Sequence, residues 1–246
     1  MTRTLVWVTR AEPAIQTTAA RLTAMGYEVL AAPVIATRTL NFAEPPPAAA
    51  LAFTSATALA AFEGRSYHHL PVFTVGDATA KAALRQGYRQ VESADGDVRD
   101  LAALLRKRAP PGRILNPCAR ETAGDLAGEL GERLIQWAVY ETVPQECLAE
   151  DAQNRLLREA ATGRLVGLTC QSPSAGRAVS ALLVGADFRQ LRGALVVFAA
   201  SQACADTFDP EEFSEIHISR FPREDALLKL MQNRLERQPS SPPAET

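Results

Sequence analysis

Residues 53–58 read Phe-Thr-Ser-Ala-Thr-Ala, and residues 75–80 read Val-Gly-Asp-Ala-Thr-Ala. A weaker copy of this pair follows, where residues 169–175 read Thr-Cys-Gln-Ser-Pro-Ser-Ala and residues 197–203 read Val-Phe-Ala-Ala-Ser-Gln-Ala. Each stretch is an apolar run, then small hydroxylated residues, then an Ala-rich stretch, a pattern typical of a strand, a tight turn and a helix N-terminus. Helix N-termini carry unpaired N–H groups and a partial positive charge, so they hold anions. The matching halves predict a two-lobed protein that grips a small anionic molecule.

The whole chain alternates apolar runs with amphipathic stretches, which predicts an α/β fold of parallel sheets flanked by helices. The N-terminal part offers only two strands, Leu5–Thr9 and Tyr27–Ala31, so the C-terminal part must complete their sheet. Two polar, proline-containing breaks at residues 36–47 and 141–145 interrupt the pattern. We therefore expect two lobes joined by a two-stranded linker: a discontinuous outer domain of residues 1–36 and 144–246, an inserted domain of residues 41–139, linker strands at 37–40 and 140–143, and a disordered tail at 238–246.

The composition argues against several kinds of partner and site. The 246 residues carry a net charge of −2 and a pI near 6.0, which disfavours binding to nucleic acid or to an anionic membrane. No apolar stretch is long enough for a signal core or a bilayer span, so we expect a cytoplasmic protein. The four cysteines form no Cys-x-x-Cys pair and only three histidines are present, so we expect no metal site.

Several short motifs occur together in one order along the chain: Val8-Thr9-Arg10, Gly26-Tyr27-Glu28-Val29, Phe53-Thr54-Ser55, Val75-Gly76-Asp77-Ala78-Thr79-Ala80, Val139-Tyr140-Glu141-Thr142 and Ser172-Pro173-Ser174-Ala175. With these motifs in this order and spacing, the chain resembles the uroporphyrinogen-III synthase family. The resemblance implies two α/β lobes joined by a two-stranded linker. It also implies a monomeric enzyme that cyclises hydroxymethylbilane, a linear tetrapyrrole with carboxylate side chains. The family's reaction removes water, inverts the terminal pyrrole ring and needs no metal or organic cofactor.

The resemblance also indicates candidate site residues. Tyr140 is the candidate proton donor, with packing at the hinge as its alternative role. Gly76 would let the backbone approach the substrate, or is a simple turn glycine. Arg10 would pair with a substrate propionate, or belongs to a structural ion pair. The turns and their hydroxyl groups supply the other substrate-binding candidates, Thr9, Thr54, Ser55, Thr79, Ser172, Ser174 and Gln202.

Two other functions remain open from the sequence. Residues 199–203 read Ala-Ala-Ser-Gln-Ala where the family commonly repeats Gly-x-x-Thr-Ala, and this departure slightly favours a non-catalytic, two-lobed binder of a small anionic ligand. The retained Tyr140 and the motif Val75–Ala80 disfavour that binder. A two-lobed sugar or nucleotide-sugar transferase would also suit the fold. The sequence offers neither an acidic metal-binding pair nor a nucleotide-binding glycine run to support that alternative.

Overall fold

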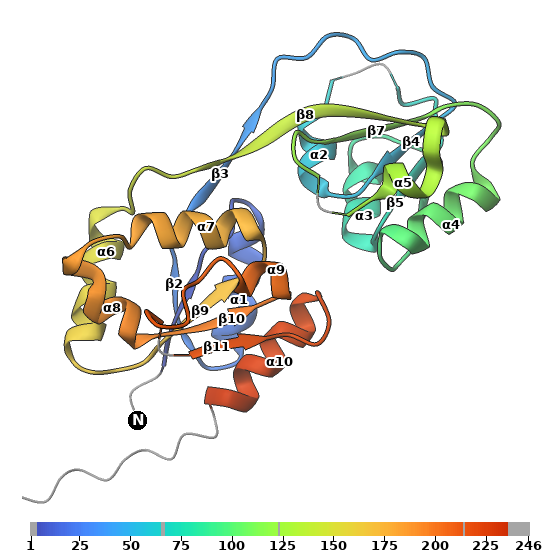
Figure 1. The fold of residues 1–246 in the computed structure, drawn as a ribbon. Helices are drawn as coiled ribbons and strands as arrows, with labels where there is room; N and C mark the ends of the chain where they lie inside the picture. Colours follow the sequence, from blue (N-terminus) through green and yellow to red (C-terminus); the bar gives the residue numbers. More distant parts are fainter. Residues whose placement is uncertain (1–3, 65–66, 123, 214, 236–246) are drawn as a thin grey trace, which may run out of the picture. The chain divides into compact units, whose positions relative to one another are not determined.

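The computed structural model describes residues 4–64, 67–122, 124–213 and 215–235 (Figure 1). The chain divides into two compact units, which we call unit 1 (Met1–Ala36 with Val143–Thr246) and unit 2 (Thr37–Thr142). Each unit is built on a sheet of mainly parallel strands flanked by helices, which confirms the predicted α/β class. The tail expected at residues 238–246 lies outside the described residues.

Unit 1 contains a five-stranded parallel sheet whose spatial order is β11-β10-β9-β1-β2. The two N-terminal strands join the C-terminal ones where β1 pairs with β9, with Val6 opposite Gly167. The strands are β1 (Leu5–Val8), β2 (Glu28–Ala31), β9 (Val166–Cys170), β10 (Leu195–Ala199) and β11 (Glu215–Ile218). The central strands β1, β9 and β10 are buried along their whole length because both faces of the sheet are covered.

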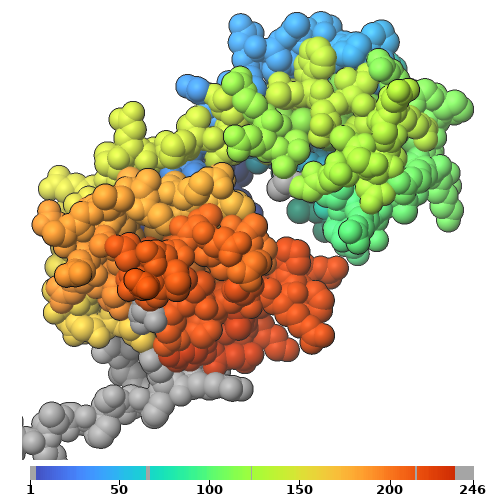
Figure 2. Space-filling view, viewed as in Figure 1, coloured from blue at the N-terminus to red at the C-terminus, as the bar shows by residue number. Residues whose placement is uncertain are grey.

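The helices of unit 1 pack on this sheet through apolar faces with helical spacing. In α1, for example, the buried residues Ile15, Thr18 and Leu22 recur at intervals of three and four. Ile15 and Leu22 join one core that includes the fully buried Trp7 and Phe198. The helices are α1 (Ala14–Ala24), α6 (Glu150–Ala161), α7 (Pro173–Leu182), α8 (Arg189–Ala194), α9 (Gln202–Ala205) and α10 (Glu224–Leu235). In the space-filling view, the orange and red C-terminal segments of unit 1 form one continuous surface (Figure 2).

Unit 2 contains a six-stranded sheet of order β3-β8-β7-β4-β5-β6. Alternate residues of β4 point to opposite faces: Leu51 and Phe53 join one apolar cluster, and Ala50 and Ala52 join another. Helices α2 (Ala56–Ala61) and α3 (Asp77–Arg85) belong to the first cluster, and α4 (Val98–Arg108) and α5 (Leu126–Leu130) to the second. The strands are β3 (Ile35–Thr39), β4 (Ala50–Phe53), β5 (Val72–Thr74), β6 (Val91–Ser93), β7 (Ile114–Ala119) and β8 (Leu134–Pro144). Both faces of this sheet are thus covered by helices.

Strands β3 and β8 connect the two units and are hydrogen-bonded neighbours. The N–H of Leu40 donates to the carbonyl of Val139 at 2.9 Å, and the N–H of Gln145 donates to the carbonyl of Val34 at 2.8 Å. The two segments therefore run in opposite directions, as a two-stranded linker. The break predicted at residues 36–47 begins inside β3, because pairing with β8 gives this polar segment a regular extended structure.

The pattern of the sequence did not predict three short elements, β6, α5 and α8. They have only three to six residues each, so their apolar periodicity is too brief to read locally. Among the helices of the described residues, none is both long and apolar enough to cross a membrane.

Candidate functional site

In both units the predicted site residues gather at the carboxyl edge of the sheet. Numbered within unit 1, the strands lie in the order 2-1-3-4-5, so the order reverses between β1 and β9. Numbered from β4 within unit 2, they lie in the order 3-2-1-4-5, so the order reverses between β4 and β7. Doubly wound sheets bind their ligands outside the carboxyl ends of the strands at this reversal, because the connections leave it in opposite directions. This rule puts the turns after β1, β9 and β4 at the places where a ligand is expected.

At the carboxyl end of β9, Ser172 begins the ten-residue helix α7. Its Oγ accepts a hydrogen bond from the N–H of Ala175 at 3.2 Å and lies 3.1 Å from the Oγ of Ser174. Pro173 occupies the first helical turn, where its missing N–H costs nothing. The structure therefore brings Ser172 and Ser174 together at a helix N-terminus whose partial positive charge suits an anion.

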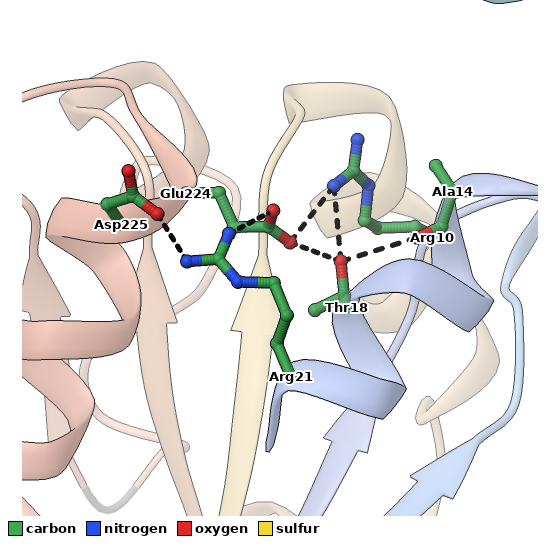
Figure 3. Close-up of polar contacts among 6 residues, drawn as sticks. All are labelled: Arg10, Ala14, Thr18, Arg21, Glu224 and Asp225. Carbon is green, nitrogen blue, oxygen red and sulfur yellow. Dashed lines mark hydrogen bonds and ion pairs between the residues drawn. The ribbon is translucent and has the colours of Figure 1, made fainter. Parts of the chain in front are cut away.

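At the carboxyl end of β1, Thr9 and Arg10 have different roles. Thr9 is fully buried, and its hydroxyl donates to the carbonyl of Thr169 at 2.8 Å. This hydroxyl joins β1 to β9, so the expectation that the Thr9 side chain binds substrate is withdrawn. Arg10 lies in an ion-pair network with Glu224, which was its alternative role, and its side chain is still 33% exposed (Figure 3).

After β10, Gln202 begins the four-residue helix α9. Its amide nitrogen donates to the Oδ1 of Asp206 at 2.7 Å on the same helix, and its side chain is exposed. Ser201, just before it, caps the helix by accepting from the N–H of Cys204. The Gln202 amide is thus held by its own helix, and α9 is too short to offer the dipole that α7 offers.

In unit 2, Ser55 and Tyr140 meet. Ser55 follows β4 and caps α2, where its Oγ accepts from the N–H of Ala58 at 3.1 Å. The same Oγ lies 3.4 Å from the phenol oxygen of Tyr140 in β8. The Tyr140 ring is half-buried and packs against the apolar cluster around Phe53, and its phenol oxygen lies beside Ser55. The neighbouring candidate Thr54 is half-buried in the same turn.

Gly76 is the residue before the nine-residue helix α3, at the carboxyl end of β5. Its φ of −143° and ψ of 164° are extended values that any residue adopts. A Cβ built at this position would meet nothing within 4 Å. Gly76 thus lies in the turn between β5 and α3, where neither the backbone conformation nor packing requires a glycine.

Two threonines surround this turn. Thr74 was not predicted, and its hydroxyl donates to the carbonyl of Gly76 at 3.2 Å. Thr79 was expected to offer a hydroxyl to the substrate, but it lies inside α3 and only 7% of it is exposed. Its N–H donates to the carbonyl of Gly76 at 3.1 Å. The cap is Gly76 itself, which has no side chain to bind the N–H groups of Asp77 and Ala78. Among the described residues these two N–H groups have no acceptor, so they remain for a ligand.

The carboxylate next to Tyr140 is neutralised by two arginines. Glu141 pairs with Arg38 and, at 3.4 Å, with Arg120. The hydrogen bond from Arg38 holds the pKa of Glu141 below its usual value, so this carboxylate stays ionised at neutral pH. The backbone N–H of Arg120 also donates to the carbonyl of Tyr140 at 2.8 Å, which fixes Tyr140 against β7. Glu141 is thus a charged partner of arginines and not a proton donor.

Known proteins similar to this chain include solved structures from Thermus thermophilus. The structure is similar to that of a mutant uroporphyrinogen III synthase from this bacterium, at 17% identity and a TM-score of 0.45, covering 95% of this chain and 100% of that one. It is also similar to the wild-type enzyme from the same bacterium, at 16% identity and a TM-score of 0.39, covering 95% of this chain and 98% of that one. No match to a curated protein sequence was found.

The family assignment rests on the sequence model. A model described as "Uroporphyrinogen-III synthase HemD" matches residues 16–229, which is most of the chain. Members of that family are enzymes of tetrapyrrole and heme biosynthesis. The chain therefore belongs to the uroporphyrinogen-III synthase family.

Proposed function

We propose that the protein cyclises hydroxymethylbilane to uroporphyrinogen III, with loss of one water and inversion of the terminal pyrrole ring. The substrate is flexible and carries eight carboxylates, four acetates and four propionates. Its pyrroles are reactive by themselves, so the enzyme's main task is to fold the substrate such that the substituted carbon of the last ring meets the electrophile. Proximity and orientation of this kind supply effective molarities of roughly 10⁵–10⁸ M.

The observation that carries the proposal is the pair formed by Tyr140 and Ser55, whose hydroxyl oxygens are 3.4 Å apart. The Ser55 oxygen accepts from the N–H of Ala58, so its own hydrogen remains free to point at the Tyr140 oxygen. When the phenol gives its proton to the departing hydroxyl of the substrate, a hydrogen bond from Ser55 stabilises the negative charge left on the Tyr140 oxygen. General acid catalysis of this kind contributes about 10²–10⁴-fold.

The proton balance of this step closes within the substrate. The electron pair of the pyrrole nitrogen expels the protonated hydroxyl as water and leaves an azafulvenium cation, the protonated azafulvene. The substituted α-carbon of the terminal ring bonds to this electrophile and gives a spiro intermediate. The original bond from that carbon to the methylene bridge of the third ring then breaks, and the bridge carbon bonds to the unsubstituted α-carbon of the terminal ring, so that this ring closes inverted. The proton that the terminal ring loses on closure replaces the one that Tyr140 gave, so the enzyme returns to its starting state.

The substrate carboxylates have suitable partners in each unit. In unit 2, the free N–H groups that follow Gly76, with Thr54 and Thr79 nearby, form one set. In unit 1, the N-terminus of α7 with Ser172 and Ser174 forms another, and Arg10 adds a full positive charge. The Thr9 hydroxyl is occupied by Thr169, so in this proposal the Thr9 side chain does not bind the substrate. Gln202 contributes little to substrate binding because its amide nitrogen already donates to Asp206.

The test is to mix the purified protein with freshly made hydroxymethylbilane and to measure the ratio of type III to type I uroporphyrin by chromatography after oxidation. We expect the type III isomer to dominate in proportion to enzyme added. A product mixture identical to that of the uncatalysed reaction would contradict the proposal and favour a non-catalytic binder, for which the altered turn at residues 199–203 is the supporting observation.

A further inference from the structure

The side chain of Arg10 is held by one nitrogen only. Its Nη1 donates to the Oγ1 of Thr18 at 3.2 Å and to the Oε1 of Glu224 at 3.3 Å. Figure 3 shows this nitrogen turned toward Thr18 and Glu224, and the other terminal nitrogen turned away from them. Among the described residues, neither Nε nor Nη2 of Arg10 has a hydrogen-bond partner. Nη1 of Arg10 is thus fixed by the protein, whereas Nε and Nη2 can donate to a ligand.

The free half is the one that recognises a carboxylate. A guanidinium binds a carboxylate most firmly through two parallel N–H donors in a planar fork. Nε and Nη2 form such a fork along the side of the group, and Nη1 lies outside it. The contacts with Thr18 and Glu224 therefore use the donor that the fork does not need. The Arg10 side chain is 33% exposed, so part of it is open to a ligand.

The charges around Arg10 do not cancel its attraction for an anion. Glu224 is the only acid that Arg10 contacts among the described residues, and its other oxygen, Oε2, accepts from Nη1 of Arg21 at 2.7 Å. This second contact is shorter than the one to Arg10, so Glu224 is balanced by Arg21 as well as by Arg10. Arg21 also pairs with Asp225, which is 83% exposed and does not contact Arg10.

Thr18 makes the arrangement rigid. It is fully buried in α1, and its hydroxyl donates to the carboxylate of Glu224 while its oxygen accepts from Arg10. Glu224 lies in the first turn of α10, where a negative charge is also favoured by the helix dipole. Two helices that are far apart in the sequence thus fix one rotamer of Arg10, and the entropy cost of ordering its long side chain is met before a ligand arrives.

We propose that Glu224 and Thr18 are positioning residues that hold Arg10 so that its Nε and Nη2 form a preset, two-pronged subsite for one carboxylate side chain of the substrate. This inference rests on the proposed function for the identity of the carboxylate. Glu224 and Thr18 touch the ligand only through Arg10.

The experiment measures binding of uroporphyrin III, the oxidised product with the same carboxylates, by fluorescence titration of the intact chain. Glu224→Ala is compared with Asp225→Ala, because both remove an acid from the first turn of α10 and a partner from Arg21, whereas only Glu224 contacts Arg10. We expect Glu224→Ala to weaken binding about tenfold, the effect of losing one charge-assisted contact. Asp225→Ala should bind within about twofold of the wild type, and Glu224→Gln, which keeps an acceptor, should recover part of the loss.

The distinguishing measurement is the double variant. Arg10→Lys keeps the charge and removes the fork, so it should also weaken binding about tenfold. If Glu224 acts through Arg10, Arg10→Lys combined with Glu224→Ala binds no more weakly than Arg10→Lys alone, whereas independent effects multiply. The inference would be overturned if the two substitutions weaken binding by multiplying factors in the double variant. It would also be overturned if a folded Glu224→Ala binds uroporphyrin III like the wild type.

Two further arms complete the test. Thr18→Val, which deletes the hydroxyl from a side chain of similar volume, gives the same comparison if Glu224→Ala is too unstable to titrate. Isomer analysis of the wild type reports separately on the proposed function. If the wild type forms no type III product but its binding of uroporphyrin III still depends on Arg10, the cyclase activity is rejected and the positioning roles of Glu224 and Thr18 stand.

Discussion

Replacing Tyr140 by Phe separates a catalytic role of the phenol from a packing role. The ring and its contacts with the apolar cluster around Phe53 remain, and the change removes one hydroxyl whose partner is Ser55 at 3.4 Å. A hydrogen bond of that length on a half-buried side chain contributes at most about 1 kcal/mol to stability. For a chain of this size, that loss lowers the melting temperature by about 2–4 °C.

The expected effect on turnover is larger than the effect on stability. A general acid that contributes at least about a hundredfold lowers the barrier by roughly 2.7 kcal/mol, which exceeds what the hydroxyl can give to the fold. We therefore expect kcat of Tyr140→Phe to fall by about 10²–10⁴-fold with KM nearly unchanged. The residual product should still be mainly the type III isomer, because ring inversion depends on how the substrate is folded.

The assay is steady-state turnover of freshly made hydroxymethylbilane, followed by isomer analysis and a thermal melt of the same preparation. Tyr140→Ala is the companion variant, since loss of the ring should cost a few kcal/mol of stability. If Tyr140→Phe keeps full turnover, the phenol is not the acid, and Tyr140 is a packing residue.

Ser55→Ala tests the partner of Tyr140. Removing this N-cap costs α2 about 1 kcal/mol, so the control is Asp125→Ala, which removes the cap of α5 in the same unit, where Oδ1 accepts from the N–H of Gly128 at 2.7 Å. We expect Ser55→Ala to lower kcat and Asp125→Ala to leave it unchanged at similar stability. In the double variant, activation free-energy losses that equal the sum of the Ser55→Ala and Tyr140→Phe losses would mean that the two hydroxyls act independently.

Three further predictions follow from the geometry. Gly76→Ala should change the melting temperature little, because its Cβ has open space, but should raise KM about tenfold if a carboxylate approaches that backbone; an unchanged KM would remove Gly76 from the site. Thr9→Val should lower the free energy of unfolding by about 1–1.5 kcal/mol, since the buried hydroxyl bonded to Thr169 is lost, as a urea titration would measure. The hydrogen bond from Arg234 lowers the pKa of Glu215 below its ordinary 4.5, so this pair stabilises the fold above that pH and the stabilisation is lost as the pH falls through the folded-state pKa. As the pH is lowered from 7 to 3, the melting temperature of Glu215→Gln should therefore decline less steeply than that of the wild type. Parallel profiles for the two proteins would contradict this.

The repeating pattern of apolar runs and small hydroxylated turns predicted the α/β class, because that pattern is local. A buried strand of a parallel sheet favours an unbroken apolar run, and a helix N-terminus favours a small polar residue such as serine at its cap, whatever the rest of the chain does. Ser55 and Ser172 could therefore be predicted at helix N-termini. Ser172 and Ser174 are also two residues apart, so their contact is a property of one turn.

The tertiary structure decided which side chains meet across the fold. Ser55 and Tyr140 are separated by 85 residues, and Arg10 and Glu224 by 214, so no local pattern indicates either contact. Burial is equally non-local: Thr9 looked like a site residue, but the carbonyl of Thr169 on the neighbouring strand takes its hydroxyl. A sequence specifies which groups can donate, accept or carry charge, whereas their partners depend on strand order and helix packing, because these bring distant segments within hydrogen-bonding distance.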